Sequence, residues 1–385
     1  MKVLLVGNYA LDRQFSMQHF ARMMEEGLRA RGITVRTIAP TPVLFASIQR
    51  VDGIWKWVGY FNKFVLFPVR LRWVARKFDV VHICDHSNAL YVGAVRSRAH
   101  IITCHDVIAI RAGLGLDDGP RVSRTGRFFQ RWILAGLAGA RRVACDSTLT
   151  QDQLLELAPA LAQRSCHISC GLNYPFAPLE PDAARSVLEA LGVPAGPYFL
   201  NVGSGLPRKN RAHAVRIYAR LLADRPHLEE KLIFVGSPLG GDISGLIDEL
   251  GLQGRVRFLS NIAGAELAAL YSQATALIFT SLAEGFGWPV IEAQACGCPV
   301  ICSQLRPMSD IAGDAALYIH PTDAAAAAAQ VVAHLSLLPA LRTRGLENAS
   351  RYGGQSMVDA YVEQYRDLLV KSRYGACPVT GEQGA

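Results

Sequence analysis

The sequence predicts an α/β protein of two domains, each a parallel β-sheet covered by helices on both faces. The 385 residues exceed the length at which one hydrophobic core keeps growing, so two cores are expected. Short, almost wholly apolar runs recur with helical stretches between them, which is typical of parallel strands buried on both faces. A Pro- and Ala-rich stretch at 176–197 separates two series of such runs and marks a domain boundary.

The first series predicts strands at 3–6, 35–39, 80–84, 101–104, 143–145 and 168–170. A helix is expected between the first two strands, because apolar residues repeat at helical spacing from 17 to 28. Ser16 can cap the start of this helix, and Gly32 follows its end. Because a helix start offers N–H groups to an anion, Ser16 is a possible supporting residue of a site.

The second series predicts strands at 198–202, 232–235, 256–259, 277–279 and 300–302. We therefore expect a first domain over 1–180, a second over 190–354 and a flexible tail at 373–385. In sheets of this kind, ligands bind at the carboxyl ends of the strands. Polar residues at those ends are the candidates for function.

Composition and charge restrict the class of protein. Half of the residues are hydrophobic and 19% are charged, as in an ordinary globular protein. The nine cysteines lie mostly in apolar runs, which favours a reducing cytoplasm, and they lack the paired spacing of a zinc site. The net charge of +8 arises in residues 1–190, which hold 24 Lys and Arg against 15 Asp and Glu and so carry +9, whereas the rest of the chain carries −1. An anionic partner should therefore meet the first half.

Two glutamates, Glu284 and Glu292, stand at the two ends of a loop and helix start. Gly285 and Gly287 let backbone N–H groups approach a ligand, and Pro289 begins a helix whose N-terminus favours negative charge. Ionised carboxylates are strong acceptors for diols, so the pair suits a sugar diphosphate, one glutamate holding the sugar and the other a ribose. The alternative is a Gly/Pro loop before an ordinary buried helix.

The segment from Glu284 to Ile301 resembles the Glu-x7-Glu motif of glycosyltransferase family 4. It has the family's Glu-Gly-Phe-Gly opening and the Cys-Gly-Cys-Pro-Val type of strand that follows. The resemblance implies that Glu284 contacts the donor sugar and Glu292 the ribose. It also implies that Phe286 and Gly287 offer main-chain amides to the donor.

A glycine turn with two adjacent cations follows the predicted strand at 198–202. Arg208 and Lys209 could neutralise a diphosphate there, or they could form a solvated basic turn. The family places an Arg/Lys pair against the donor diphosphate, so the resemblance implies that these two cations stabilise the departing nucleoside diphosphate. The other donor-binding candidates in this turn are Gly203, Ser204 and Asn210.

His105 and Asp106 follow the predicted strand at 101–104. A lone histidine at such a place is more often structural. In the family, a His-Asp pair so placed lies beside the donor sugar. The resemblance therefore implies that His105 bonds a sugar hydroxyl or assists proton transfer, with Asp106 in support.

The stretch 54–77 carries aromatic residues at helical spacing among cations. Such a stretch can lie on an anionic lipid leaflet, or it can be an ordinary helix that packs its aromatic face into the first domain. The candidates for a membrane-facing surface are Lys56, Trp57, Phe61, Lys63 and Arg70.

Over nearly its whole length the chain is similar to the GT-B fold, two Rossmann-like domains facing a cleft. The resemblance implies an acceptor-side first domain to which helix 355–372 returns, and a second domain that binds a nucleotide sugar. Our hypothesis is a retaining glycosyltransferase that moves a hexose from a nucleotide-diphosphate sugar to a glycan or lipid-linked acceptor, in cell-surface polysaccharide or glycolipid synthesis. We expect no metal, no cofactor and no nucleic acid partner, and a cytoplasmic location that is peripheral at the inner face of the cytoplasmic membrane. The alternatives are a sugar-nucleotide epimerase of the same architecture and a catalytically silent nucleotide-sugar-binding subunit.

Overall fold

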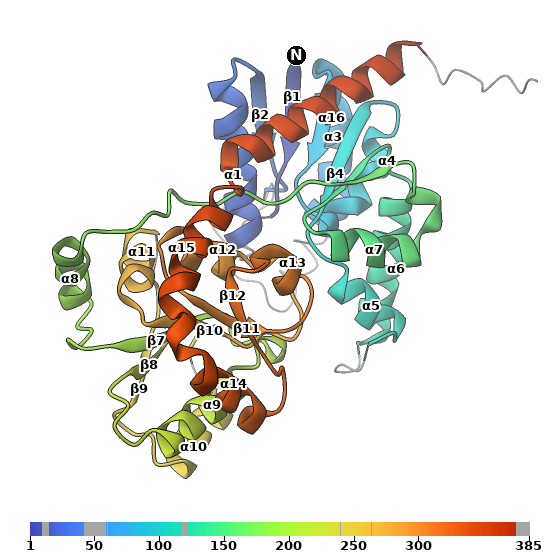
Figure 1. The fold of residues 1–385 in the computed structure, drawn as a ribbon. Coiled ribbons are helices and arrows are strands. Elements are labelled where there is room, and N and C mark those ends of the chain that lie inside the picture. Colours follow the sequence, from blue (N-terminus) through green and yellow to red (C-terminus); the bar gives the residue numbers. More distant parts are fainter. Residues whose placement is uncertain are drawn as a thin grey trace, which may run out of the picture. The chain divides into compact units, whose positions relative to one another are not determined.

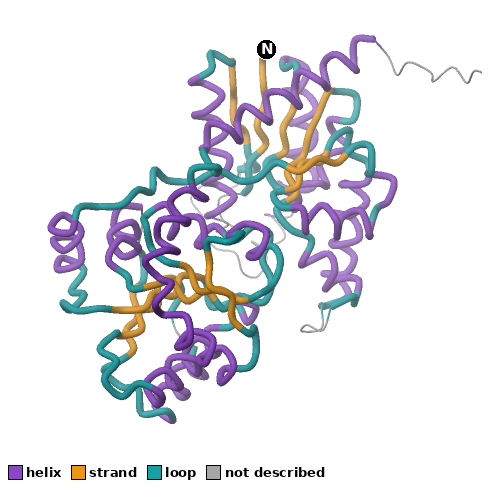
Figure 2. Tube along the Cα trace, viewed as in Figure 1, coloured by secondary structure: helices purple, strands orange, loops and turns teal. Residues whose placement is uncertain are grey.

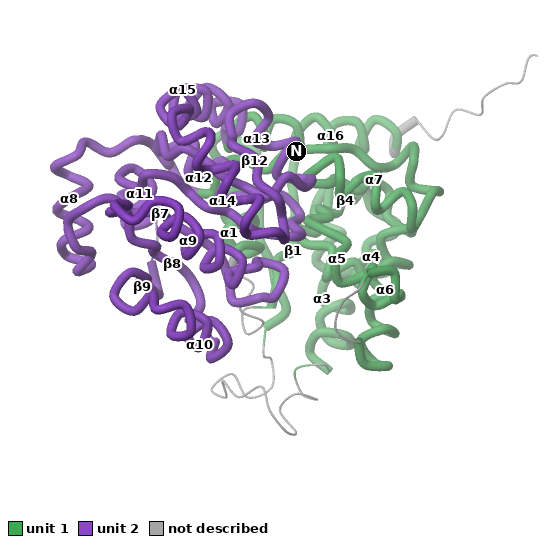
Figure 3. Tube along the Cα trace, turned by 60° about the horizontal axis from the view of Figure 1, so that its bottom comes forward, with its two compact units in different colours: residues 1–173, 354–385 green, residues 174–353 purple. Residues whose placement is uncertain are grey.

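The computed structural model describes residues 1–9, 15–41, 59, 61–117, 122–238, 240–262 and 264–374. The chain divides into two compact units. Unit 1 comprises Met1–Asn173 and Gly354–Ala385, and unit 2 comprises Tyr174–Gly353 (Figure 3). The division falls just before the Pro- and Ala-rich stretch, and the last helix belongs to unit 1.

Unit 1 contains a six-stranded parallel sheet in the order β2-β1-β3-β4-β5-β6 (Figure 1). Its strands are β1 (Lys2–Val6), β2 (Thr34–Ile38), β3 (Val80–Ile83), β4 (Ala99–Cys104), β5 (Val143–Cys145) and β6 (Ser165–His167). Its helices are α1 (Phe15–Ala30), α3 (Phe67–Val74), α4 (Val92–Val95), α5 (Ile108–Leu114), α6 (Arg124–Ala138), α7 (Thr148–Leu157) and α16 (Gly354–Tyr374). Short helical turns are η2 (Asn62–Leu66), η3 (Ala75–Lys77), η4 (His86–Tyr91) and η5 (Pro159–Leu161).

Both faces of this sheet are buried, because alternate residues of β1 enter different cores. Val3 and Leu5 pack with α1 and α16, whereas Leu4 and Val6 pack with α3, α4, α6 and α7. This explains why β1 is apolar at every position from Val3 to Val6 instead of at every second one.

Helix α16 is fixed to the sheet by a buried polar chain. His82 of β3 bonds the Tyr365 hydroxyl at 2.7 Å and the Thr103 hydroxyl at 2.8 Å, and Thr103 bonds the Tyr361 hydroxyl at 2.8 Å. Burial lowers the pKa of His82 to about 3, so its imidazole is neutral. A neutral ring can accept on one nitrogen and donate on the other, as these two hydroxyl partners require.

Unit 2 contains a second six-stranded parallel sheet, in the order β12-β11-β10-β7-β8-β9, with strands and helices alternating along the chain (Figure 2). Its strands are β7 (Tyr198–Gly203), β8 (Lys231–Gly236), β9 (Val256–Leu259), β10 (Ala276–Phe279), β11 (Val300–Ser303) and β12 (Ala316–Ile319). Its helices and helical turns are α8 (Pro181–Ala190), η6 (Pro207–Lys209), α9 (Arg211–Asp224), α10 (Gly241–Glu249), α11 (Gly264–Gln273), α12 (Trp288–Ala295), α13 (Met308–Ala312), α14 (Ala324–His334), η7 (Leu335–Leu337) and α15 (Leu338–Ala349). The prediction of two parallel-sheet α/β domains is confirmed.

Two local predictions were wrong, and one strand was missed. The sixth strand is β6 and not 168–170, although the N–H of Ile168 still continues its ladder to the carbonyl of Cys145 at 2.9 Å. Strand β12 was not predicted, because four residues at a sheet edge give little periodic signal. Helix α1 begins at Phe15, so Ser16 lies inside its first turn and not before it.

One helical run, 324–371, is apolar enough to cross a membrane by length and composition alone, which is weak evidence of a span. The run is divided among α14, α15 and α16. Ala327, Ala328 and Val331 of α14 are buried in the core of unit 2. The apolar residues therefore have a packing role in that unit.

Candidate active site

The strand order of unit 2 changes direction between β7 and β10. Strands β8 and β9 follow on one side of this pair, and β11 and β12 on the other. Ligands of doubly wound sheets bind at such a reversal, beyond the carboxyl ends of the strands. The loops that leave β7 and β10 therefore define the candidate site.

Hydrogen bonds hold these two loops side by side. The N–H of Leu282 donates to the carbonyl of Arg208 at 2.8 Å, and the Thr280 hydroxyl donates to the carbonyl of Asn210 at 2.9 Å. Asn210 has a left-handed φ of 52°, which asparagine tolerates better than most residues. Its side-chain amide donates to the carbonyl of Pro321 at 3.0 Å. Asn210, the last residue before α9, is thus held in place by hydrogen bonds of its backbone and its side chain.

Glu284 brings the two predicted cations together. Its carboxylate accepts from Arg208 Nη1 at 2.8 Å and from Lys209 Nζ at 2.5 Å. The Ser281 hydroxyl donates to the same carboxylate at 2.5 Å. The Glu284 side chain is 7% exposed and that of Lys209 is 13% exposed. These residues do not form a solvated basic turn, because the ammonium group is buried against a carboxylate.

The site carries more positive than negative charge. Burial would raise the pKa of Glu284, but the charges of Lys209 and Arg208 lower it below its usual value. Burial lowers the pKa of Lys209, and the nearby Arg208 and Arg211 add to this effect against the attraction of Glu284. Three cations around one ionised carboxylate leave an excess suited to a polyphosphate.

Arg211 was not singled out from the sequence. It is buried at the start of α9 and donates to the carbonyl of Ser237 at 2.7 Å and to the carbonyl of Gly203. These bonds tie the ends of β7 and β8 together. A cation in the first turn of a helix opposes the helix dipole, and this was the signal that could have identified it.

The remaining donor-binding candidates of the β7 loop lie next to Lys209. Gly203 ends β7, and a side chain there would meet the Lys209 methylenes at 3.5 Å. Ser204 is half-buried and directly follows the strand. Gly203 is therefore close to the paired cations, and Ser204 is its neighbour in the chain.

Glu292 lies in α12, on a different element from Glu284. It is buried and accepts a hydrogen bond from the Tyr271 hydroxyl at 3.1 Å. Gly287 precedes the helix with a φ of 106°, a conformation that favours glycine. Phe286 is buried with its ring edge-on to Tyr352, at 5.8 Å between centroids. The side chain of Phe286 thus holds the loop, and only its main chain is left for a ligand.

In unit 1, His105 points into the protein. Its Nδ1 lies 2.5 Å from Asp146 Oδ2 and its Nε2 lies 2.8 Å from the carbonyl oxygen of Cys84. Both partners are acceptors, so both ring nitrogens carry protons and the ring is an imidazolium. Burial opposes this charge, but the carboxylate of Asp146 raises the pKa of His105 to about 9. Both ring nitrogens are thus engaged within unit 1, and the expected contact of His105 with a sugar stays a prediction.

Asp106 and Ser16 have local positions. The Asp106 carboxylate accepts from the N–H of Ile108 at 3.0 Å and so caps the start of α5. Ser16 is exposed in the first turn of α1. A supporting role of either residue in a site stays a prediction.

One group of side chains in the described part of the chain has the composition of a metal site. His105, Asp146 and Cys170 have ligand atoms within 4.8 Å of one another. Both nitrogens of His105 are already hydrogen-bonded, and burial raises the pKa of Cys170 well above its usual value, which keeps the thiol protonated. These three residues therefore fit an internal hydrogen-bonded cluster better than a metal centre.

The membrane-facing candidates divide into two groups. Lys56 and Trp57 lie outside the described residues. Phe61 and Arg70 are exposed, and Lys63 lies with its Nζ 5.2 Å from the centre of the Tyr9 ring.

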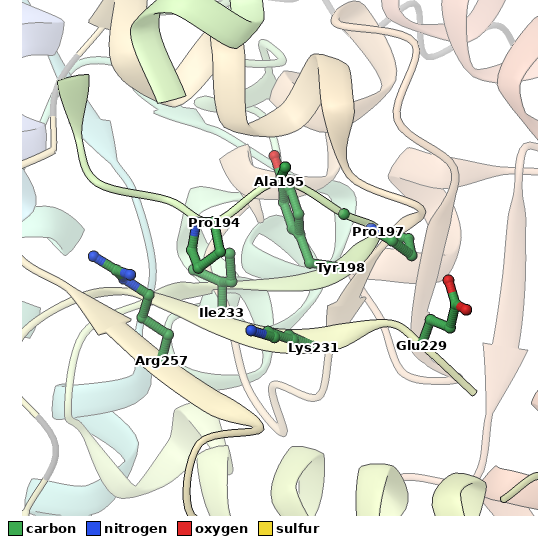
Figure 4. A pocket seen from close by; sticks show the side chains of 9 residues that line it. Pro194, Ala195, Pro197, Tyr198, Glu229, Lys231, Ile233 and Arg257 are labelled. Carbon is green, nitrogen blue, oxygen red and sulfur yellow. The ribbon is translucent and has the colours of Figure 1, made fainter. Parts of the chain in front are cut away.

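Two hollows of unit 2 lie at the other end of its sheet. A cavity of about 40 Å³ is lined by residues such as Pro197, Lys231 and Arg257 at the amino ends of β7, β8 and β9 (Figure 4). A more open hollow of about 660 Å³ lies beside it, lined by Asp224, His227 and others. Neither hollow contains the residues of the candidate site.

Comparison with known proteins identifies the class of enzyme to which the chain belongs. The family described as Glycosyltransferase Family 4 matches residues 17–174, and the family described as Glycosyl transferases group 1 matches residues 190–351. The chain is similar to sucrose-phosphate synthase of Thermosynechococcus elongatus, with a TM-score of 0.73 and 21% identity over 96% of this chain and 99% of the other. It is also similar to HepE of Anabaena solved with UDP-glucose, with a TM-score of 0.68 and 17% identity over 95% and 100% of the two chains. The protein is thus a glycosyltransferase with the GT-B fold.

Proteins with a similar sequence show the family to which the chain belongs. The chain is 30% identical over 318 residues to D-inositol 3-phosphate glycosyltransferase 1 of Catenulispora acidiphila, covering 77% of this chain and 74% of the relative. It is 26% identical over 310 residues to O-antigen chain mannosyltransferase B of Escherichia coli, covering 79% of each. The chain belongs to the family 4 type of GT-B glycosyltransferases.

Proposed function

We propose that this enzyme transfers a hexose, with retention at the anomeric carbon, from a nucleotide-diphosphate sugar to a glycan or lipid-linked acceptor. The observation that carries the proposal is the cluster of Arg208, Lys209 and Glu284 at the reversal of strand order. Two cations there can bind a diphosphate, and a carboxylate beside them can accept from sugar hydroxyls. The relative named for O-antigen chains and the neighbour solved with UDP-glucose support the acceptor and donor classes.

In this proposal the diphosphate leaves as its bond to the anomeric carbon breaks, and Arg208 and Lys209 stabilise its growing negative charge. The acceptor oxygen forms the new bond to that carbon on the same face, and the departing phosphate accepts the proton of the acceptor hydroxyl. Glu292 holds the ribose, and the Tyr271 hydroxyl orients its carboxylate. The cations act where other transferases use a metal ion, so the reaction requires neither a metal nor a cofactor.

The biological setting is part of the same proposal. The enzyme acts in cell-surface polysaccharide or glycolipid synthesis, in the cytoplasm and at the inner face of the cytoplasmic membrane. The excess of Lys and Arg in residues 1–190 supports a position at an anionic surface.

A panel of nucleotide sugars screened by thermal shift tests the donor. A ligand that binds only the folded state raises the melting temperature, so one nucleotide sugar should stand out from the rest. The selected donor is then incubated with and without glycan and lipid-linked acceptors, and the released nucleoside diphosphate is measured.

We expect release that depends on the acceptor. Conversion of the donor to another sugar nucleotide without any acceptor would identify an epimerase. Binding without any turnover across the acceptors would identify a silent subunit.

A further inference from the structure

Unit 1 exposes a row of apolar side chains along η2 and α3. Phe61, Val65, Val69 and Trp73 follow one another four residues apart, so they lie on one face of the helical segment. All four are exposed, and Trp73 is 61% exposed. Large apolar side chains aligned on one exposed face are unusual in a folded unit and indicate an interaction surface.

Helix α6 adds two aromatic residues to this row. Phe128 and Trp132 are one turn apart, and Phe128 is 63% exposed. The two segments touch: Phe64 stacks on Phe129 with ring centres 5.4 Å apart and lies 5.8 Å from Trp132. The six exposed residues thus lie on two segments of unit 1 that touch at Phe64. We call them the aromatic face: Phe61, Val65, Val69, Trp73, Phe128 and Trp132.

The aromatic face is distinct from the rest of the described surface. Every exposed phenylalanine and tryptophan among the residues whose burial is described belongs to it. A single exposed leucine elsewhere needs no explanation, but four aromatic rings on two touching segments do.

Only positive charge accompanies the aromatic face. Residues 61–77 and 122–138 contain eight Lys and Arg and no Asp or Glu. The rest of the chain then holds 32 Lys and Arg against 32 Asp and Glu, so these two segments account for the whole excess. Within the described residues, Arg70, Arg72, Arg127 and Arg131 are exposed and have no carboxylate within 4.0 Å. Lys77 lies over the Trp73 ring, with its Nζ 4.7 Å from the ring centre.

We propose that the aromatic face docks on an anionic lipid bilayer. Aromatic rings enter the boundary between headgroups and acyl chains, and the surrounding cations bind the lipid phosphates. This inference rests on the proposed function, which places the enzyme at the cytoplasmic membrane. It adds the residues that would contact that membrane. It replaces the candidates Lys56 and Trp57, which lie outside the described residues, with Phe128 and Trp132, which the sequence analysis did not name.

The test is sedimentation of the full chain with vesicles of phosphatidylcholine, with and without phosphatidylglycerol. Binding should require phosphatidylglycerol and fade in 1 M salt, where the screening length falls to about 3 Å. The variant R70E/R127E should bind at least about 30-fold more weakly, the factor expected for the loss of two cations at an anionic surface, because the two added carboxylates are repelled as well. The variant F128S/W132S should lose binding to the vesicles that contain phosphatidylglycerol, because it removes the inserted rings.

Matched controls lie in unit 2. Leu337→Ser/Leu346→Ser replaces two exposed apolar residues, and Arg216→Glu/Arg220→Glu makes the same change in charge on exposed positions. Both controls should bind vesicles as the original protein does. Circular dichroism of each variant should be unchanged, because the replaced side chains are exposed.

Three results would overturn the inference. The first is equal binding to both kinds of vesicle, and the second is undiminished binding of the folded R70E/R127E or F128S/W132S variant. The third is a dimer in vesicle-free solution that F128S/W132S dissociates, since the face would then bind a second copy of the chain. Donor binding measured without vesicles is a separate readout, so failure of docking can be told apart from failure of the proposed reaction.

Discussion

The ammonium group of Lys209 lies 2.5 Å from Oε1 of Glu284. The residue expected to hold a diphosphate and the residue expected to hold the sugar are therefore paired with each other. Each orients the other, and Arg208 shares the same carboxylate at 2.8 Å. A preorganised group of this kind needs little rearrangement when charge develops on a leaving phosphate.

Replacing Lys209 by Met should lower turnover by about 10²–10³-fold at saturating donor, as loss of one preorganised donor to a developing anion does. Because Lys209 is buried against Glu284, the variant should also melt at a lower temperature. Steady-state kinetics and a thermal melt measure the two effects. Arg216→Met, on the exposed side of α9, is the control and should change neither. Full turnover by the Lys209 variant would exclude the diphosphate role.

Replacing Glu292 by Gln should weaken donor binding and leave turnover at saturation nearly unchanged. A ribose contact persists from the ground state to the transition state, so its loss appears in KM and not in kcat. Tyr271→Phe removes the hydroxyl that donates to this carboxylate and should act in the same direction, but less. Donor titration by calorimetry, beside kcat, is the measurement. A fall in kcat with unaltered donor affinity would count against the assignment.

The imidazolium of His105 should make the stability of the protein depend on pH. The folded state holds its proton up to about pH 9, whereas an unfolded histidine loses it near 6.5. The folded state therefore binds more protons between these values, and the free energy of unfolding should fall by about 3 kcal/mol as pH rises from 6.5 to 9.

Urea unfolding at a series of pH values measures this slope. In Asp146→Asn the carboxylate that raises the pKa is gone, so the slope should flatten in the variant that remains folded. A flat profile in the original protein, or an unchanged slope in the variant, would show that His105 is neutral.

Transferase activity should survive chelation. Arg208, Lys209 and Arg211 already supply the positive charge at the candidate site, and the sequence contains no Asp-x-Asp metal clamp. Nucleoside diphosphate release is measured in EDTA and again after addition of Mg²⁺ or Mn²⁺. Loss of activity in EDTA that either ion restores would contradict the metal-independent reaction.

The sequence was sufficient to predict most strands of the two sheets, because central parallel strands buried on both faces, such as β1, β8 and β10, form almost continuous apolar runs. Their order was not predictable, since β7 and β10 become neighbours only through the folding of about 75 intervening residues. The pairing of Lys209 with Glu284 depends on that order. The inward direction of His105 likewise depends on Asp146, 41 residues away. Local spacing carries no information about such partners.

The exposure of Phe128 and Trp132 could not be predicted from the sequence either. Aromatic residues one turn apart on a helix are the usual pattern of a buried face. Only the packing of α6 in unit 1 shows that Ile133 and Leu137 form its buried side instead. The same four-residue spacing can therefore describe a core or a surface, and contacts decide between them.

The most direct test of the central claim is calorimetric titration of the protein with UDP, GDP and ADP and with the matching monophosphates. We expect one nucleoside diphosphate to bind at least about tenfold more tightly than its monophosphate, a difference of about 1.4 kcal/mol from the second phosphate. That difference should disappear in Lys209→Met while the monophosphate binds as before. Equal affinity for diphosphate and monophosphate, or an undiminished difference in the variant, would contradict the assignment of Arg208 and Lys209 as the diphosphate site.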